Sequence, residues 1–203
     1  MSLLRPLLLL VAVAFALVTH ASDSVSLRVI AINDFHGNLQ PPKGRNDDGD
    51  LGGAAWLAAH ARAAIVGHPH NVFVSAGDLI NASPFLSALF QDEPTIEAMN
   101  AMGLTLNAVG NHEFDEGVDE LRRMQDGGCH PKLGCQFQPT FAGARFRFLA
   151  ANVIDARTAR TLFPAFDIRE YDGVKVAFIG LTLQKEGAIA AFEGRNAAAR
   201  PWA

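Results

Sequence analysis

The sequence is short of charge, of cysteine and of long apolar runs. Only 19% of its 203 residues are charged, and the net charge is −4. Because the basic residues are scattered, we expect no positively charged surface for nucleic acid. The sequence has no internal repeat and no coiled-coil heptad. With 49% hydrophobic residues, the chain is long enough for one domain with its own core and too short for two large ones.

The clearest apolar run, at residues 7–18, is too short to span a bilayer comfortably. Arg5 precedes this run, and the small-residue stretch THA follows it and ends at Ala21, which together predict a signal peptide over residues 1–21. We therefore expect export to the periplasm or beyond, with cleavage near Ala21 and no stable membrane anchor. An uncleaved anchor is the alternative. Because no cysteine lies near the cleavage site, a bacterial lipoprotein is disfavoured.

The two cysteines, Cys129 and Cys135, lie in the loop-like stretch GGCHPKLGC. Two cysteines close together in one loop of an exported chain predict a disulfide. Two free thiols are one alternative. A zinc knuckle with His130 is a weaker one, because such a site takes about four ligands and this loop offers three.

The hydrophobic pattern predicts strands and helices that alternate through the first part of the chain. Strands are expected at residues 25–33, 71–77 and 104–110, and helices at 51–66, around 83–90, at 93–103 and at 118–128. Such βαβ units predict an α/β fold with a largely parallel sheet. Later strands with antiparallel pairing are expected at residues 145–153, 162–171 and 174–183.

Three polar clusters follow the first three expected strands: NDFHG, AGD and GNHEFD. Because the carboxyl ends of parallel strands face one crevice, four side chains are expected to converge there. They are Asp34, His36, Asp78 and Asn111. The first two are two residues apart, so an extended chain would direct them to the same side. Gly77 and Gly110 permit sharp turns and close approach at the other two ends.

Carboxylate, imidazole and amide ligands together suit Mn, Fe, Zn or similar divalent ions. Two such ions about 3.5–4 Å apart can bind a hydroxide and clamp a phosphoryl group, and Asp78 can bridge them. His112 is then free to meet the phosphate or the leaving oxygen, and Asp115 can orient its ring. The alternative, that these residues are ordinary turn formers, leaves His36, His112 and their order unexplained.

The ordered motifs NDFHG, GD and GNHEFD resemble the signature of the calcineurin-like metallophosphoesterases. The longer forms INDFHG and VGNHEFDEG, the cysteine loop and VAFIGLTL are similar to the secreted bacterial 5′-nucleotidase and UDP-sugar hydrolase branch. This resemblance covers about residues 25–183. It implies a four-layer α/β/β/α sandwich that binds two divalent metal ions such as Mn, Zn or Co.

The resemblance also implies a role for each site residue. Asp34 and His36 would hold the first metal ion, Asp78 would bridge, and Asn111 would hold the second. His112 with Asp115 would form a catalytic dyad that stabilises the phosphoryl transition state and assists the leaving group. Glu113 matches an acidic position of the signature and is assigned no ligand role.

The sequence departs from the family pattern after about residue 183. His130 is its last histidine, so the later Gly-His and Gly-His-x-His ligands of the family are absent, as is the second domain that stacks the nucleoside base. Residues 184–203 form a divergent tail whose pattern favours neither helix nor strand and leaves disorder open. We therefore expect residues 22–183 to be the N-terminal part of a metallophosphoesterase domain, incomplete at its C-terminus, through truncation or a shifted reading frame.

Other polar and aromatic residues are expected outside the site. The stretch GHPH at residues 67–70 imitates a late ligand motif, but it precedes the second strand, so His70 is expected at the opposite rim of the sheet. His60 is expected to be a surface or packing residue. Trp56 and the phenylalanines are expected in the core rather than in a base-stacking platform. The sequon NAS at 81–83 has no meaning in a bacterial host.

The expected function is metal-dependent hydrolysis of nucleotides, of the 5′-nucleotidase or UDP-sugar hydrolase type, by attack of a metal-bound hydroxide on phosphorus. The expected partner is a nucleotide or another phosphate ester. The oligomeric state is not fixed by the sequence. One alternative is an exported, inactive fragment with part of the metal site. Another is a minimal enzyme that borrows ligands from a partner chain.

Overall fold

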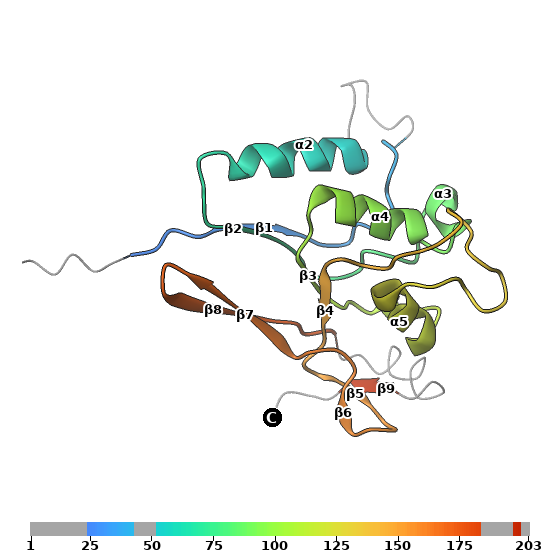
Figure 1. The fold of residues 1–203 in the computed structure, drawn as a ribbon. Helices are drawn as coiled ribbons and strands as arrows, with labels where there is room; N and C mark the ends of the chain where they lie inside the picture. Colours follow the sequence, from blue (N-terminus) through green and yellow to red (C-terminus); the bar gives the residue numbers. More distant parts are fainter. Residues whose placement is uncertain (1–23, 43–51, 184–196, 200–203) are drawn as a thin grey trace, which may run out of the picture.

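The computed structural model describes residues 24–42, 52–183 and 197–199. A four-stranded sheet in the order β1-β2-β3-β4 lies at its centre (Figure 1). These strands are Arg28–Ile32, Asn71–Ser75, Leu106–Ala108 and Arg147–Leu149. All neighbouring strands of this sheet are parallel, with Val29 opposite Val72 and Leu106 opposite Arg147. The expected α/β fold with a parallel sheet is therefore confirmed.

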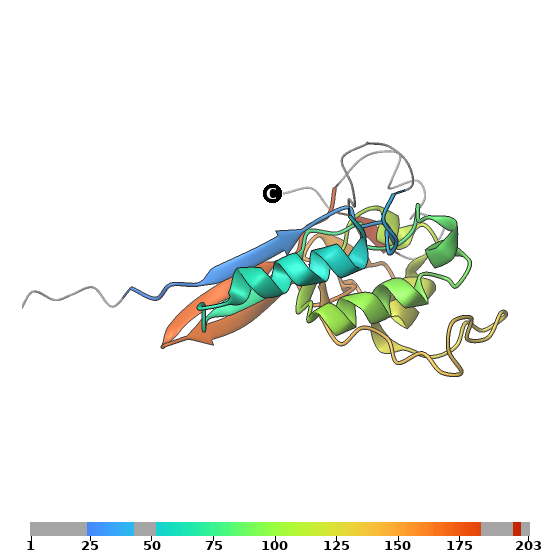
Figure 2. The ribbon, with the colours of Figure 1, turned by 90° about the horizontal axis from the view of Figure 1, so that it is seen from above.

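Helices that connect the strands cover one face of this sheet, and α2 and α4 run side by side there (Figures 1 and 2). The helices are α2 (Gly53–Ile65), α3 (Phe85–Ala88), α4 (Glu93–Met102), the 3₁₀ turn η1 (His112–Phe114) and α5 (Val118–Asp126). The helix α4 ends at Gly103, whose φ of 83° provides the left-handed cap that the sequence indicates. None of the helices in the described segments combines the length and apolarity needed to cross a membrane.

The opposite face of the sheet carries a hairpin of β7 (Phe166–Tyr171) and β8 (Val174–Ile179) (Figure 1). Arg147 of β4 pairs with Asp167 of the hairpin at 2.6 Å. Several apolar side chains of the hairpin remain exposed: Phe166, Ile168, Val174 and Ile179. The described residues thus form three layers, and a second helical layer outside the hairpin is not among them.

The expected single strand at 145–153 is wrong, because the structure divides it into two. The strand β4 joins the parallel sheet, whereas β5 (Val153–Asp155) pairs antiparallel with β6 (Arg160–Thr161) and with β9 (Ala197–Ala199). The division arises because the N–H groups of Ala150 and Ala151 donate to Pro164 and Gly180 instead of continuing a ladder. Of the expected tail 184–203, only β9 is described. The rest of it, like the expected signal peptide 1–21, lies outside the described residues.

The segment between α5 and β4 is fixed by a disulfide and a buried ion pair. Cys129 is bonded to Cys135, which confirms the expected disulfide and removes the thiols that a zinc knuckle would need. Arg123 of α5 pairs with the buried Glu93 of α4 at 2.7 Å. The other carboxylate oxygen of Glu93 accepts a 3.1 Å hydrogen bond from the backbone of Phe137, two residues after the disulfide. The segment is therefore anchored to both helices.

Candidate metal centre

The loops that follow β1 and β2 run together at the carboxyl edge of the sheet. The N–H of Asp34 donates to the carbonyl of Gly77, and the N–H of His36 donates to the carbonyl of Asp78, both at 3.0 Å. Asp34, His36 and Asp78 have φ angles of 51°, 45° and 53°. Our expectation of an extended chain from Asp34 to His36 was therefore wrong. Each left-handed non-glycine residue costs about 1–3 kcal/mol, a strain that is common at functional sites.

Two glycines let the loops after β2 and β3 touch. A Cβ atom on Gly77 would lie 2.5 Å from the backbone nitrogen of Gly110, and one on Gly110 would lie 2.2 Å from Oδ1 of Asp78. No side chain fits at either distance. Close approach at these two glycines is what the sequence indicates, and its effect is to bring Asp78 beside the loop that carries His112.

The convergence at this edge gives a group of side chains suited to a metal ion. His36, Asp78 and His112 each offer one ligand atom, and these atoms lie within 4.8 Å of one another. The rings of the two histidines are 4.9 Å apart between centroids and nearly perpendicular. Oδ1 of Asp34 lies 3.9 Å from Nε2 of His36. Asn111 begins the turn η1 directly before His112. The structure therefore gathers all three strand ends, and it places His112 closer to the ligand group than the sequence indicates.

The hydrogen bond of His36 fixes which of its ring nitrogens can bind a metal. Nδ1 lies 2.8 Å from the carbonyl oxygen of Asn81. A carbonyl only accepts, so Nδ1 carries the proton and Nε2 keeps the lone pair. Nε2 is also the nitrogen nearest Asp34, on the side of the expected site. The ring is therefore held in the tautomer that a metal ligand needs.

Asn81 is a site residue that the sequence did not reveal. Its carbonyl accepts from His36, and its Nδ2 donates to the backbone carbonyl of His112 at 2.8 Å. Its φ is 62°, a left-handed conformation that asparagine tolerates better than most residues. From sequence, Asn81 stands out only as part of a sequon. The usable signal was an asparagine soon after a strand end, where a left-handed turn is common.

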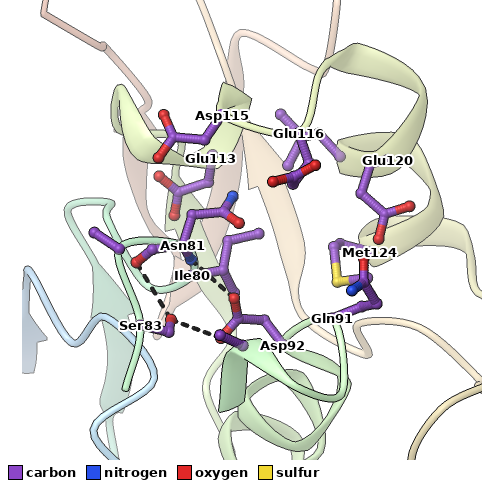
Figure 3. A pocket seen from close by; sticks show the side chains of 13 residues that line it. Ile80, Asn81, Ser83, Gln91, Asp92, Glu113, Asp115, Glu116, Glu120 and Met124 are labelled. Carbon is purple, nitrogen blue, oxygen red and sulfur yellow. Dashed lines mark hydrogen bonds between the residues drawn. The ribbon is translucent and has the colours of Figure 1, made fainter. Parts of the chain in front are cut away.

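Buried Asp92 holds the Asn81 loop in place. Its carboxylate accepts the N–H of Asn81 at 3.0 Å, the hydroxyl of Ser83 at 2.7 Å and the hydroxyl of Thr95 at 3.1 Å. Figure 3 shows Asn81 and Ser83 joined to Asp92 by dashed lines. Since Asp92 directly precedes α4, this contact ties the site loop to a packed helix.

The side chain of Glu113 connects the loops that follow β2 and β3, because it accepts hydrogen bonds from both. Its carboxylate accepts the backbone N–H groups of Asp78, Leu79 and Gly110 at 2.8–2.9 Å. The side chain is almost completely buried, at 1% exposed. Burial raises the pKa of Glu113 to about 7, although these three N–H groups oppose the rise. With its oxygens occupied by backbone donors, Glu113 positions the loops.

The expected dyad has hydrogen-bonding geometry. Nδ1 of His112 lies 2.8 Å from Oδ2 of Asp115. This hydrogen bond raises the pKa of His112, and the negative charges of Asp115 and Asp78 raise it further against partial burial. A cavity of about 250 Å³ adjoins the dyad. Its charged lining residues, all labelled in Figure 3, are Asp92, Glu113, Asp115, Glu116 and Glu120.

His70, His60 and Trp56 are the residues that the sequence predicts to lie outside the site. His70 pairs with Asp172 of the β7–β8 turn at 2.7 Å, immediately before β2, so its expected place at the opposite rim is confirmed. His60 stacks on Trp56, with 5.9 Å between ring centroids. Trp56 is 46% exposed, so its expected place in the core is wrong. Only Ala61 of α2 is buried, so most of this helix, Trp56 included, remains at least partly accessible.

Comparison with known proteins identifies the family. The uncharacterized protein in pqq-V 5′region of Acinetobacter calcoaceticus is 46% identical over 164 residues, which are 73% of this chain and 80% of that protein. A 5′-nucleotidase of Vibrio vulnificus is 31% identical over 166 residues, which are 81% of this chain and 26% of the nucleotidase. The structure of Haemophilus influenzae NAD nucleotidase has a TM-score of 0.66 and 26% identity, over 86% of this chain and 29% of that chain. The chain belongs to the 5′-nucleotidase branch of the calcineurin-like metallophosphoesterases.

The chain corresponds to only part of each of these two nucleotidases. It spans 26% of the Vibrio vulnificus 5′-nucleotidase and 29% of the NAD nucleotidase chain. One family model, described as the C-terminal domain of the small subunit of 3-isopropylmalate dehydratase, matches residues 179–203. That match is confined to the end of the chain and includes none of the site residues. The two nucleotidases, in contrast, match 81% and 86% of this chain.

Proposed function

We propose that this chain is a metal-dependent phosphoesterase that acts on nucleotides. The observation that carries the proposal is the group of His36, Asp78 and His112, whose ligand atoms lie within 4.8 Å of one another at the edge of a metallophosphoesterase sheet. In this proposal Asp34 and His36 would hold one ion, Asp78 would contribute to holding both, and Asn111 would hold the other.

The residues fit such ions in both their chemistry and their tautomer. Carboxylate, imidazole and amide oxygen suit Mn, Zn or Co, and the free lone pair of His36 is on Nε2. When bound, the ions supply Lewis acidity, which lowers the pKa of a water molecule and neutralises phosphoryl oxygens. The left-handed backbones at Asp34 and Asp78 support the same assignment, because strained residues of this kind cluster at functional sites.

His112 lies close enough to bind a metal ion, but its surroundings favour a proton-donating role. The hydrogen bond to Asp115 occupies Nδ1 and raises the pKa of His112, so the ring is suited to carry a proton on Nε2. A protonated Nε2 donates to a phosphoryl oxygen or to the leaving oxygen. Asn81 and Asp78 hold the backbone of His112, so the ring approaches the substrate from a fixed position.

An exported, inactive fragment with a partial metal site is the second candidate, since the late histidine ligands are absent from the sequence. Hydrolysis of AMP and of a chromogenic phosphate ester with added Mn²⁺ or Co²⁺ separates the two. We expect turnover that Asp78→Asn abolishes and that the matched control Asp172→Asn retains, because Asp172 lies at the opposite rim. No turnover, together with less than one ion per chain, would establish the fragment.

We also propose that the protein acts outside the cytoplasm. The signal-peptide pattern of residues 1–21 and the disulfide between Cys129 and Cys135 both support an oxidising compartment. Expression of the full chain with fractionation of the periplasm and the medium tests this. Recovery of the chain only in the cytoplasm, with residues 1–21 intact, would contradict it.

A further inference from the structure

A second cavity, of about 540 Å³, adjoins the candidate metal centre. It lies between the end of β1 and the first turns of α2, and its lining includes Asp34, Phe35, Trp56, Leu57 and His60. Small-molecule sites are typically clefts of about 300–1,000 Å³ with apolar walls and a few polar groups. The size and lining of this cavity are therefore those of a site for a nucleoside-sized molecule.

The aromatic wall of this cavity presents a flat, accessible surface. Trp56 is 46% exposed, and its ring stacks on His60 at 5.9 Å with 25° between the planes. Stacking on His60 restrains the indole while leaving part of it accessible. An exposed, restrained aromatic surface in a cleft favours another flat ring by stacking. The helix α2 itself does not require a tryptophan here, because only Ala61 of this helix is buried.

One residue connects this cavity to the metal centre. Asp34 lines the cavity, and its Oδ1 lies 3.9 Å from Nε2 of His36. A phosphoryl group bound at the metal centre would therefore have the cavity next to it, on the side of Asp34. The other flank, beside Asp115, is lined by carboxylates, which suit a flat neutral ring less well. Of the two cavities that flank the described site, only the one on the side of Asp34 therefore offers an apolar wall to the esterified group of a substrate.

We propose that the cavity beside Trp56 binds the flat aromatic part of the substrate, a nucleobase, while the phosphoryl group occupies the site of Asp34, His36 and Asp78. This assignment rests on the proposed function and adds to it a base-binding subsite within this chain. Trp56 is a positioning residue in this account, because it contacts the base and not the reacting atoms. The subsite makes phosphate esters of nucleosides preferred over those of simple sugars.

Ligand binding to metal-free protein tests the subsite independently of hydrolysis. The chain has two tryptophans, so a Trp202→Phe background leaves Trp56 as the only indole that fluoresces. We expect AMP to quench this fluorescence saturably and ribose 5-phosphate to leave it unchanged. Because stacking on an aromatic side chain contributes about 1–3 kcal/mol, the Kd of AMP should be at least about fivefold lower than that of ribose 5-phosphate.

Variants measured by calorimetry complete the test. Trp56→Ala should lose the preference for AMP over ribose 5-phosphate, and Trp56→Phe should retain most of it. The matched control is Phe166→Ala, which removes an aromatic ring of similar exposure, 53%, outside the cavity and should keep the full preference. Unchanged preference in Trp56→Ala, or equal Kd values of the two ligands for the parent protein, would overturn the subsite. If AMP binds through Trp56 but is not hydrolysed with any metal, the subsite stands and the proposed function fails.

Discussion

The backbone N–H of His112 donates a 2.9 Å hydrogen bond to Oδ1 of Asp78. This bond runs between the loops that follow β3 and β2. Glu113 joins the same loops in the opposite direction, by accepting the N–H of Asp78. The carboxylate that is proposed to bridge two ions is therefore oriented by the backbone of the residue that is proposed to donate a proton. The two functions share one support, so a change in the loop contact should affect both.

Gly110→Ala tests this shared support. The added Cβ would lie 2.2 Å from Oδ1 of Asp78, so either the carboxylate or the loop must move. We expect a loss of about 1–3 kcal/mol in the free energy of unfolding, as for overpacked sites, and metal affinity lower by about 10–100-fold. Denaturant unfolding and calorimetric titration of Mn²⁺ measure the two effects.

The matched control for Gly110 is Gly67→Ala. No atom lies within 4 Å of a Cβ at Gly67, although its φ is 76°. The control should cost about 1 kcal/mol through its backbone conformation and leave Mn²⁺ affinity unchanged. Equal metal affinity in Gly110→Ala and in the parent protein would show that the Asp78 carboxylate does not depend on this close approach.

Asn81 offers a second test, because its backbone and its side chain act on different histidines. Asn81→Gly keeps the left-handed backbone and the carbonyl that accepts from His36, but it removes the Nδ2 donor to His112. We expect kcat for phosphate-ester hydrolysis to fall by about 10–100-fold with little change in metal affinity. Asn81→Ala should show the same kinetic loss and should also be less stable by about 1–2 kcal/mol, since alanine at a φ of 62° is strained. Wild-type kcat in Asn81→Gly would exclude a positioning role.

Part of this site could be predicted from the sequence, because the end of a strand is marked by residues that are adjacent in the sequence. An apolar run that stops at Asp78 or at Asn111 predicts both the strand and the edge at which the polar group emerges. The same reasoning predicts the role of Gly77 and Gly110, because a glycine between a strand and a polar residue permits a sharp turn and close backbone approach.

The supports of the site could not be predicted in this way, because they act across the chain. Asn81 and His36 are 45 residues apart, and Glu113 is 35 residues from Asp78. Nothing local identifies a carbonyl that fixes a tautomer or a carboxylate that collects backbone donors. The exposure of Trp56 was mispredicted for a similar reason. A tryptophan at helical spacing is usually core, and only the packing of α2 on the sheet decides which flank is exposed.

The pKa of His112 should depend on Asp115. Their hydrogen bond raises it above the reference value of 6.5, so histidine ring signals followed by NMR in metal-free protein should titrate above that value. Asp115→Asn should lower the pKa, and Asp172→Asn, which removes the partner of His70, should not. A raised pKa in the folded state contributes stability below pH 6.5, and this contribution is lost as the pH rises through the folded pKa. Identical titration of His112 in Asp115→Asn and in the parent protein would rule out the dyad.

Glu113 should make the free energy of unfolding fall as the pH rises, whereas a carboxylate with a lowered pKa makes it rise. Burial raises its pKa from 4.5 to about 7, so between these values the folded chain binds more protons than the unfolded chain. The free energy of unfolding should therefore fall as the pH rises from about 4.5 to 7, by about 3 kcal/mol from this group, and then level off. Glu113→Gln removes the titration, and it also turns an amide N–H₂ toward backbone donors, so it should be less stable than the parent at every pH.

The measurement for Glu113 is urea unfolding of both proteins in EDTA from pH 4.5 to 8. The informative quantity is the difference between the two unfolding free energies, because the titrations of all other groups cancel in it. This difference should shrink as the pH rises from about 4.5 to 7, since the parent protein then increasingly has a buried charge to accommodate. A flat difference for Glu113→Gln would mean that the carboxylate stays ionised throughout, stabilised by the N–H groups of Asp78, Leu79 and Gly110.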